Sequence, residues 1–517
     1  MWQRLSLYDL RVIGHYLGVL TLFFTIALAV PFVTAIAFGE WEPASHYLLA
    51  MGITLAVGSV LRFLRIQPGR LTRHQALVVT GLAWIVFALF AAIPLFLSGH
   101  YANFPDALFE GVSGLTTTGA TTVMDLDHLS YADNMWRFVM HLVGGLGLVV
   151  VGLTFGLFGK GSGATLFASE GHSEHVVPNI MQSAKFIGRI AIVFIVIGTV
   201  AVSIVCLSLG MEPVRAITQS LWMALSAFMT AGFVPTSENI LYYHSFALEV
   251  VLVVIMLTGT VNFALHSEIV RGRVKDFFMD METRMGGAWL IVMVAVLAAT
   301  MAASTNVFGA LPAMMRRGLF MVVAAFSTTG FQNITTGQLA NGLSTGAILV
   351  IAILMAAGST SGSTAGGMKL SRLVMIVKSV TSTIKKTISP DSARVVVSYY
   401  HMGRRTVTPS MLSDAMTVTA LYAVTYIIGA LVGVVYGNDA TSAILESIAM
   451  ASNGGITSGI VGPGMDWGLE AFYIFEMWAG RLEFVTLLAL IAQIGVSIVP
   501  HSLADWYHKN HGNRDRS

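Results

Sequence analysis

A short pattern of residues that could bind an ion occurs four times in this sequence. In each copy a brief apolar segment runs into a turn rich in threonine and glycine. The four turns contain Thr117, Thr118 and Gly119; Thr230, Ala231 and Gly232; Thr328, Thr329 and Gly330; and Asn453, Gly454 and Gly455. Glycine permits backbone angles that other residues avoid, so the carbonyl oxygens of such a turn can point inward. Four sets of carbonyls around one axis would replace the water shell of a monovalent cation, as in a selectivity filter.

A second polar group interrupts an apolar segment of the chain. It comprises Gly358, Ser359, Thr360, Ser361, Gly362, Ser363, Thr364, Ala365, Gly366 and Gly367, followed by Lys369. Irregular backbone at membrane depth survives only where it is buried in protein or lines a water-filled cavity. We therefore predict that this segment borders the pore below the third turn and acts as a gate. The alternative is close helix packing through small residues.

Arg481 is the third candidate, because a charged residue inside an apolar span is costly and usually faces the protein interior. One interpretation places it beneath the filter, where it repels or paces cations. The other is a structural pairing with Glu483 or with backbone. His141 and His266 also lie in apolar surroundings, where hydrogen bonds between helices are more common than proton relays. No spacing of His, Cys and carboxylates predicts a zinc or iron site.

The composition indicates a membrane protein. Of 517 residues, 55% are hydrophobic and 11% are charged, and the mean hydropathy is +0.75. Soluble domains carry about 25% charged residues. The first apolar run, 16–38, exceeds the roughly 7–15 residues of a signal-peptide core, which predicts a retained spanning helix.

Ten segments are long and apolar enough to be predicted as spanning helices. They are 14–38, 46–66, 75–98, 134–158, 186–210, 242–265, 287–305, 342–378, 411–436 and 469–499. The last eight form four pairs, and each pair encloses one turn. The predicted fold is an all-α polytopic membrane protein with four pseudo-repeats of helix, re-entrant pore loop and helix around a central pore, plus two extra N-terminal transmembrane helices.

The predicted units follow from this pairing. They are a two-helix N-terminal unit at 1–70, pore repeats at 71–165, 180–270 and 285–390, the third with a broken second helix, and a fourth repeat at 405–517.

Charge predicts the orientation of the chain. Nearly all Lys and Arg residues fall in loops on the side of the termini, which places both termini in the cytoplasm. The four turns then enter from outside, where acidic residues would raise the local cation concentration. These are Asp106, Glu110, Asp125, Asp127, Asp133, Glu212, Glu238, Asp439 and Asp466.

Together these residues resemble the TrkH/KtrB/HKT superfamily of potassium transporters, and the bacterial TrkH branch most closely. The resemblance covers nearly the whole chain. It rests on the first and third turns, 136–147, 262–266, 362–369 and 480–483. The second and fourth turns depart from the family pattern at Met229 and at 453–456, and His141 stands where glutamine is expected.

The resemblance implies potassium uptake across a bacterial inner membrane, with K⁺ bound in a filter formed by the four turns. It also implies that 358–367 is an intramembrane gating loop and Arg481 the pore arginine. The implied partners are a second copy of the chain, a cytosolic nucleotide-binding subunit of the TrkA type and the lipid bilayer, with no nucleic acid.

Two other functions remain as alternatives. A sodium- or proton-coupled potassium symporter would use inverted repeats around a midplane site, whereas these repeats share one orientation and no intramembrane carboxylate relay is obvious. An intramembrane hydrolase using Ser361 would need a glycine two residues before it, but Gly358 lies three residues before it. We therefore do not expect an enzyme.

Overall fold

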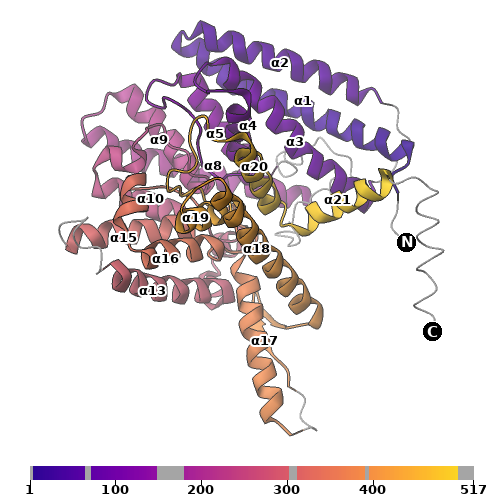
Figure 1. Cartoon of the computed structure of the whole chain (residues 1–517), viewed down its shortest axis with the longest axis vertical. Coiled ribbons are helices and arrows are strands. Elements are labelled where there is room, and N and C mark those ends of the chain that lie inside the picture. The colour runs from indigo at the N-terminus through magenta and orange to yellow at the C-terminus, as the bar shows by residue number, and fades with distance from the viewer. Residues whose placement is uncertain (1–3, 65–70, 148–179, 302–310, 391–394, 499–517) are drawn as a thin grey trace.

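The computed structural model describes residues 4–64, 71–147, 180–301, 311–390 and 395–498, and these residues are mostly helical (Figure 1). The strands within these ranges are β1 (Ser398–Tyr400) and β2 (Arg404–Thr406), which pair antiparallel as one hairpin. This confirms the prediction of an all-α polytopic fold.

The first two helices stand outside the repeated unit. α1 (Leu7–Phe38) and α2 (Trp41–Arg62) form an antiparallel pair that turns at Gly39, a left-handed residue with φ 72°. The two helices approach closely, since an added Cβ at Gly18 would clash with the backbone of Gly58. The Tyr47 hydroxyl of α2 donates to Asp133 Oδ1 at 2.7 Å, which joins this pair to the first module.

Four modules follow, and in each a short helix of 12 to 16 residues leads into one of the four turns. Module 1 holds α3 (Arg73–Leu97), α4 (Phe104–Leu115) and α5 (Tyr131–Leu146), and module 2 holds α8 (Ile180–Ser208), α9 (Pro213–Phe228), α10 (Phe246–Gly259) and α11 (Phe263–Val270). Module 3 holds α13 (Met281–Met301), α15 (Leu311–Phe326), α16 (Thr345–Ala356) and α17 (Leu370–Ile388). Module 4 holds α18 (Pro409–Val435), α19 (Ala440–Ala451), α20 (Trp467–Arg481) and α21 (Val485–Ile498). Shorter connecting elements are α12 (Val274–Met279), η1 (Asn239–Tyr243) and η3 (Gln338–Gly342).

Local sequence explains where the short helices begin. The side chain of Asn103 accepts a hydrogen bond from Asp106 N at the start of α4, and Asp439 caps α19 in the same way. Proline occupies the first position of α9, where its missing N–H leaves no intrahelical bond unmade. Side-chain caps therefore start α4 and α19, and a first-turn proline starts α9.

The second helix of modules 2, 3 and 4 is broken, whereas the sequence predicted a break in the third alone. α10 and α11 meet at 99°, and α20 and α21 meet at 111°. Asn262 starts a new helix by accepting from Ala264 N, and left-handed Glu483 and Phe484 end α20. The predictions of continuous spans at 242–265 and 469–499 were therefore wrong, because short capping signals outweighed the continuous hydropathy.

The helix lengths reflect these breaks. Within the described residues, six helices are long and apolar enough to cross a membrane, or eight if each bent pair counts as one span. α16 is interrupted at Ala356, as the predicted break in 342–378 required. The C-terminal part of the predicted span 134–158 lies outside the described residues.

A buried ion pair joins modules 1 and 2. Arg137 Nε donates to Glu110 Oε1 at 2.8 Å, and both side chains are completely buried. Arg137 also donates to the Val234 carbonyl at 3.1 Å and lies over the Phe233 ring at 4.2 Å. The guanidinium therefore connects α4 and α5 to the segment that follows α9.

We expect Arg137→Ala to lower the free energy of unfolding by about 3–5 kcal/mol, because it leaves the Glu110 carboxylate buried without its partner. Thermal unfolding of the detergent-solubilised protein measures the change. Arg316→Ala is the matched control, since Arg316 pairs with Glu249 but remains 34% exposed; we expect a loss of about 1 kcal/mol or less there. Equal losses in the two variants would contradict the role given to the buried pair.

Candidate ion site

The structure brings the four predicted turns together in a closed ring. An added Cβ at each turn glycine would lie closer than 3.0 Å to a carbonyl oxygen of the next module. The glycine and carbonyl pairs are Gly119 with Ala231, Gly232 with Thr329, Gly330 with Gly454, and Gly455 with Thr118. The four carbonyls occupy the same position in the four turns, directly before the glycine. Any side chain at these glycines would therefore displace the ring.

All four turns share one backbone conformation. The residue two positions before the glycine is left-handed in every copy, and so is the glycine itself. The φ angles are 58° at Thr117, 50° at Thr230, 51° at Thr328 and 54° at Asn453, with 83°, 91°, 84° and 58° at Gly119, Gly232, Gly330 and Gly455. The second and fourth copies, which depart from the family pattern in sequence, therefore adopt the same left-handed backbone as the first and third.

The copies differ in how their side chains support the turn. In the first, the Thr116 and Thr118 hydroxyls lie 2.8 Å apart, and in the third, those of Ser327 and Thr329 lie 2.7 Å apart. The second copy has Met229 and Ala231 at these positions and cannot form such a pair.

Asn453 supports the fourth turn in a different way. Its amide Nδ2 donates to Thr118 Oγ1 of the first turn at 3.1 Å and to the Met477 carbonyl at 2.9 Å. The fourth turn is therefore tied to the first by its asparagine.

Two buried glutamates, Glu110 and Glu446, hold the chain that follows the first and fourth turns. Glu110 was predicted to lie on the outer surface, and Glu446 was given no role from the sequence. Glu110 accepts hydrogen bonds from Thr122 N at 3.0 Å and the Thr121 hydroxyl at 3.1 Å. Glu446 accepts from Ser458 N at 2.7 Å and the Thr457 hydroxyl at 2.6 Å. The signal was present in the sequence, because both glutamates occupy the same place in the first and fourth copies of the pattern.

A cavity of about 430 Å³ opens above the ring. Its lining includes Gly119, Gly232 and Gly455 together with Asp125, Asp127 and Glu238. A hydrogen bond from His128 lowers the pKa of Asp125, so this carboxylate stays charged to lower pH. These three acidic residues make the mouth of the ring favourable for cations.

The predicted acidic outer surface is smaller than the sequence suggested. Asp106, Glu110 and Asp133 are buried rather than solvated. Each is occupied in hydrogen bonds to the protein: Gly464 N donates to Asp106, Arg137 to Glu110, and the Tyr47 hydroxyl to Asp133. Their charges therefore hold segments together instead of attracting ions from solution.

The segment 358–367 lies directly against the turns. Thr364 Oγ1 donates toward the carbonyls of Phe228 and Gly259, each at 3.0 Å, and lies 3.2 Å from Thr230 Oγ1. Gly366 N donates to Thr328 Oγ1 at 2.9 Å. The segment thus touches the left-handed threonines of the second and third turns.

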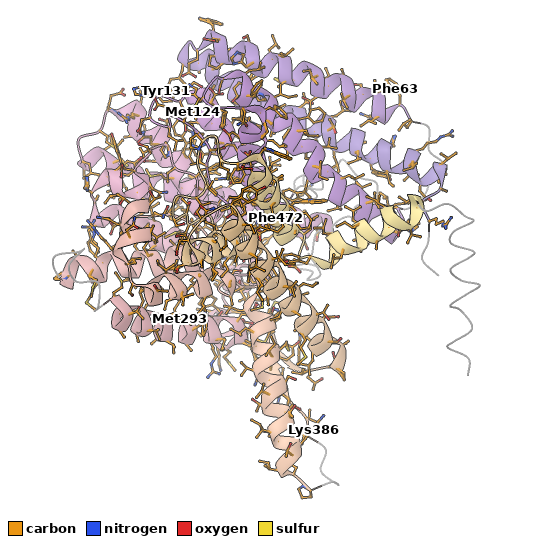
Figure 2. All side chains as sticks on the ribbon, viewed as in Figure 1. Phe63, Met124, Tyr131, Met293, Lys386 and Phe472 are labelled. Carbon is orange, nitrogen blue, oxygen red and sulfur yellow. The ribbon has the colours of Figure 1, made fainter. Side chains whose placement is uncertain are left out.

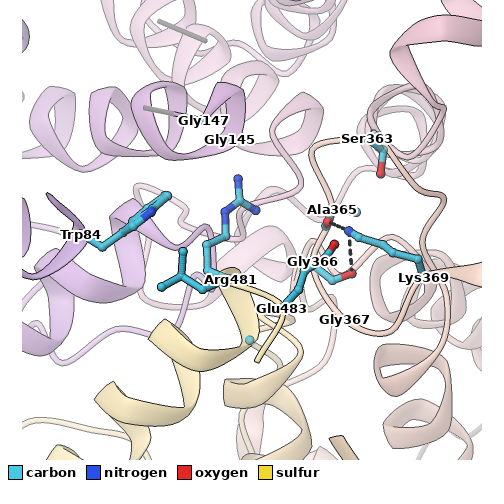
Figure 3. Close-up of a pocket in the computed structure, with 13 residues that line it drawn as sticks. Trp84, Gly145, Gly147, Ser363, Ala365, Gly366, Gly367, Lys369, Arg481 and Glu483 are labelled. Atoms are coloured by element: carbon cyan, nitrogen blue, oxygen red, sulfur yellow. Dashed lines mark hydrogen bonds between the residues drawn. The ribbon is translucent and has the colours of Figure 1, made fainter. Parts of the chain in front are cut away.

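The small residues of this segment also pack closely, as the packing interpretation expected. An added Cβ at Gly358 would clash with the Phe326 carbonyl, and one at Gly366 with the Ser452 carbonyl. Lys369 Nζ turns back on the segment and donates to the carbonyls of Ala365 and Gly366 (Figure 3).

Arg481 reaches the first turn from the end of α20. Its Nη1 donates to Thr117 Oγ1 and to the Thr364 carbonyl, both at 3.1 Å, and its Nη2 donates to the Gly144 carbonyl. It borders a cavity of about 70 Å³ together with Trp84, Lys369 and Glu483 (Figure 3). Arg481 therefore makes the backbone contacts that the structural interpretation predicted. Glu483 forms an ion pair with Arg372 of α17.

Further carboxyl groups are buried in module 4, although no intramembrane carboxylate relay was expected. Glu470 and Glu476 of α20 are both almost completely buried. The Ser447 hydroxyl donates to Glu476 Oε1 at 2.7 Å, and the Glu470 carboxyl lies within hydrogen-bonding reach of the Asp106 carboxyl of module 1. Module 4, which carries the fourth turn, therefore contains these two buried carboxyl groups in addition to Glu446.

The two histidines differ from each other. His266 Nε2 lies 3.1 Å from the Thr258 carbonyl across the bend between α10 and α11, which fits the expected hydrogen bond. His141 instead stacks on Phe233 with ring centroids 4.5 Å apart, and its ring nitrogens have no hydrogen-bond partner among the described residues.

Comparison with known proteins identifies the family. A family model for TrkH, described as a cation transport protein, matches residues 44–495. The Trk system potassium uptake protein TrkH of Escherichia coli K12 is 27% identical, over 93% of this chain and 98% of that protein. An uncharacterized cation transporter of Methanocaldococcus jannaschii is 28% identical, over 95% and 97% of the two chains.

The fold agrees with a solved structure. The crystal structure of the potassium transporter TrkH from Vibrio parahaemolyticus superposes with a TM-score of 0.78 and 23% identity, covering 93% of this chain and 98% of the other. Because the family model spans most of the chain and the ring of turns is complete, the chain belongs to the TrkH family of cation transport proteins.

Proposed function

We propose that this chain mediates potassium uptake through a gated, channel-like pore whose filter is the ring of four turns. The observation that carries the proposal is the cyclic contact of each turn glycine with the carbonyl of the next module. A closed ring of carbonyls can replace the water shell of a monovalent cation without any charged ligand. The similarity to the Trk system potassium uptake protein TrkH of Escherichia coli supports potassium as the ion.

Transport is then driven by the membrane potential. Moving one positive charge inward gains about 2.3 kcal/mol per 100 mV. The acidic mouth formed by Asp125, Asp127 and Glu238 concentrates cations at the entrance. No separate energy source is needed for uptake at a negative interior potential.

The segment 358–367 is the proposed gate, and Arg481 assists it. The segment crosses beneath the turns through Thr364 and Gly366. Arg481 places a positive charge beside Thr117 and holds the segment through the Thr364 carbonyl. Cations leaving the ring meet this barrier before they reach the cytoplasm.

The proposed location is the inner membrane of a bacterium with both termini in the cytoplasm. We also propose a homodimer and a cytosolic nucleotide-binding partner of the TrkA type. α17 projects away from the other helices (Figure 1) and carries Lys386 near its far end (Figure 2). Exposed Val377, Val380 and Ile384 on this helix offer an apolar face for assembly.

Ion-coupled symport is the second candidate, and the buried carboxyls of module 4 favour it. Glu470 and Glu476 could exchange protons or hold a second cation during transport. Reversal potentials separate the two functions. A potential that follows the potassium gradient alone supports the channel, whereas a shift with pH or with sodium supports coupling.

The simplest test of potassium uptake is growth rescue. Expression in a bacterium that lacks potassium uptake should restore growth at low potassium, and co-expression of a TrkA-type subunit should increase the rescue. Expression without any gain in growth or in potassium content would contradict the proposed function.

Gly119→Val or Gly330→Val should abolish potassium flux or its selectivity over sodium. A β-branched side chain resists the left-handed backbone and would collide with the neighbouring carbonyl. Gly437→Val is the matched control, because Gly437 has φ 87° but open space around its Cβ. Radiotracer uptake in vesicles measures both ions; unchanged potassium/sodium discrimination in the ring variants would contradict the filter.

Deletion of 361–364 should raise basal potassium flux, because it removes the contacts of Thr364 with the Phe228 and Gly259 carbonyls that hold the segment in place. Electrical recording from reconstituted protein measures the open fraction. A correctly folded deletion variant with equal or lower flux would remove the gating role.

A further inference from the structure

A buried glutamate outside the ring fastens the gating segment at two points. Glu282 lies in the first turn of α13 and is 1% exposed. Its Oε1 accepts hydrogen bonds from the backbone N–H groups of Ser361 and Ser371, each at 2.9 Å. One carboxylate oxygen therefore joins the middle of 358–367 to the start of α17.

We propose that Glu282 is the positioning residue that holds the gating segment closed, and that the β1–β2 hairpin acts on it through His401 and Asp280. The inference rests on the proposed gating role of 358–367. Both hydrogen bonds end on a buried carboxyl group, and an N–H group that loses such an acceptor without gaining water costs free energy. Because both donors depend on one acceptor, loss of Glu282 frees the segment and the start of α17 together.

Asp280 sets the position of Glu282. Asp280 Oδ2 accepts from Glu282 N at 2.9 Å and from Thr283 N at 3.3 Å, which caps the beginning of α13. Asp280 Oδ1 lies 2.7 Å from His401 Nδ1. The side chains of Asp280, Glu282 and His401 are all buried. A movement of His401 therefore acts on the helix end that carries Glu282.

The hairpin that carries His401 is docked at a second point. The Tyr400 hydroxyl donates to Asp276 Oδ1 of α12 at 2.6 Å. The hairpin turn is closed by a hydrogen bond from His401 N to the Gly403 carbonyl at 2.9 Å. Arg404 and Arg405 on β2 are exposed, so a ligand or protein on this face can reach the hairpin without entering the pore.

The same three side chains have the spacing of a metal site, since their donor atoms all lie within 4.8 Å of one another. The observed bonds favour a hydrogen-bonded connection instead. Glu282 Oε1 already accepts two N–H groups, and Asp280 Oδ1 already meets His401. A metal ion bound to these same oxygens would compete with these bonds, including both that fasten the gating segment.

The test compares Glu282→Ala and Glu282→Gln in the full-length protein. We expect about a tenfold rise in basal potassium flux for Glu282→Ala, the effect of losing one or two hydrogen bonds to a buried carboxyl group. Glu282→Gln, which keeps an acceptor oxygen without the charge, should give a smaller rise. Potassium/sodium selectivity should stay unchanged in both, because the ring is untouched.

A labelling measurement distinguishes release of the segment from general loosening. Ser363 lines the cavity beside Arg481, and Cys206 is the single cysteine of the chain. In a Cys206→Ala background, Ser363→Cys should react faster with a cytoplasmic thiol reagent when Glu282 is replaced. Glu268→Gln is the matched control, because Glu268 pairs with Arg271 and Arg273 near the same membrane face; it should alter neither flux nor labelling.

His401→Gln tests the connection to the hairpin and should raise flux and labelling in the same direction as Glu282→Gln. If the 361–364 deletion raises flux but both Glu282 variants match the wild type in flux and labelling, the positioning role is wrong and the gate stands. If the deletion itself has no effect, the gate is wrong. If the Glu282→Ala protein does not accumulate, flux and labelling of Glu282→Gln decide the question. If a chelator abolishes the change in flux, the three side chains bind a metal ion and the hydrogen-bonded connection is wrong.

Discussion

The whole structure depends on holding four turns in a left-handed backbone at the same point in space. Left-handed angles cost an ordinary residue roughly 1–2 kcal/mol, and four non-glycine residues adopt them here. Such strain persists only where the surroundings over-determine it. The hydroxyl pairs of the first and third turns, the Asn453 amide, and the Glu110 and Glu446 carboxylates supply that support. Close packing of glycine against carbonyl then leaves no space for side chains inside the ring.

Support for the turns comes from the broken second helices. A continuous helix would pass the turns without offering them polar groups, whereas each break frees backbone groups that must be satisfied. Phe263 N donates to the Gly362 carbonyl at 3.0 Å, and Leu370 N donates to the Ser359 carbonyl at 2.7 Å. The breaks therefore satisfy one another, and they place the segment 358–367 and Arg481 beside the threonines of the ring.

The four modules share a backbone but not a chemistry. Module 3 contributes the long segment 358–367, module 4 contributes Arg481, and module 1 contributes the buried Glu110–Arg137 pair. Within the described residues, hydroxyl pairs brace the first and third turns and glutamates hold the first and fourth. The second turn, with Met229 and Ala231, lacks both kinds of support and rests on Thr364 of module 3. A symmetric ring can thus be regulated from one side, because its supports are unequal.

Local patterns in the sequence were enough to predict the four turns, the helices around them and the break in module 3. Repetition of the Thr/Gly turns located Gly119, Gly232, Gly330 and Gly455, hydropathy located the helices around them, and the run from Gly358 to Gly367 located the break in module 3. The breaks at Asn262 and Glu483 were not predicted, because one cap or one left-handed pair is a weak signal inside a continuous apolar run. Closure of the ring, burial of Asp106 and Glu110, and the hydrogen bond from Ser361 N to Glu282 were visible only in the folded structure. These depend on contacts between segments far apart in the chain, and the identity of a contact partner at such separation is set by how all the helices pack rather than by any local pattern.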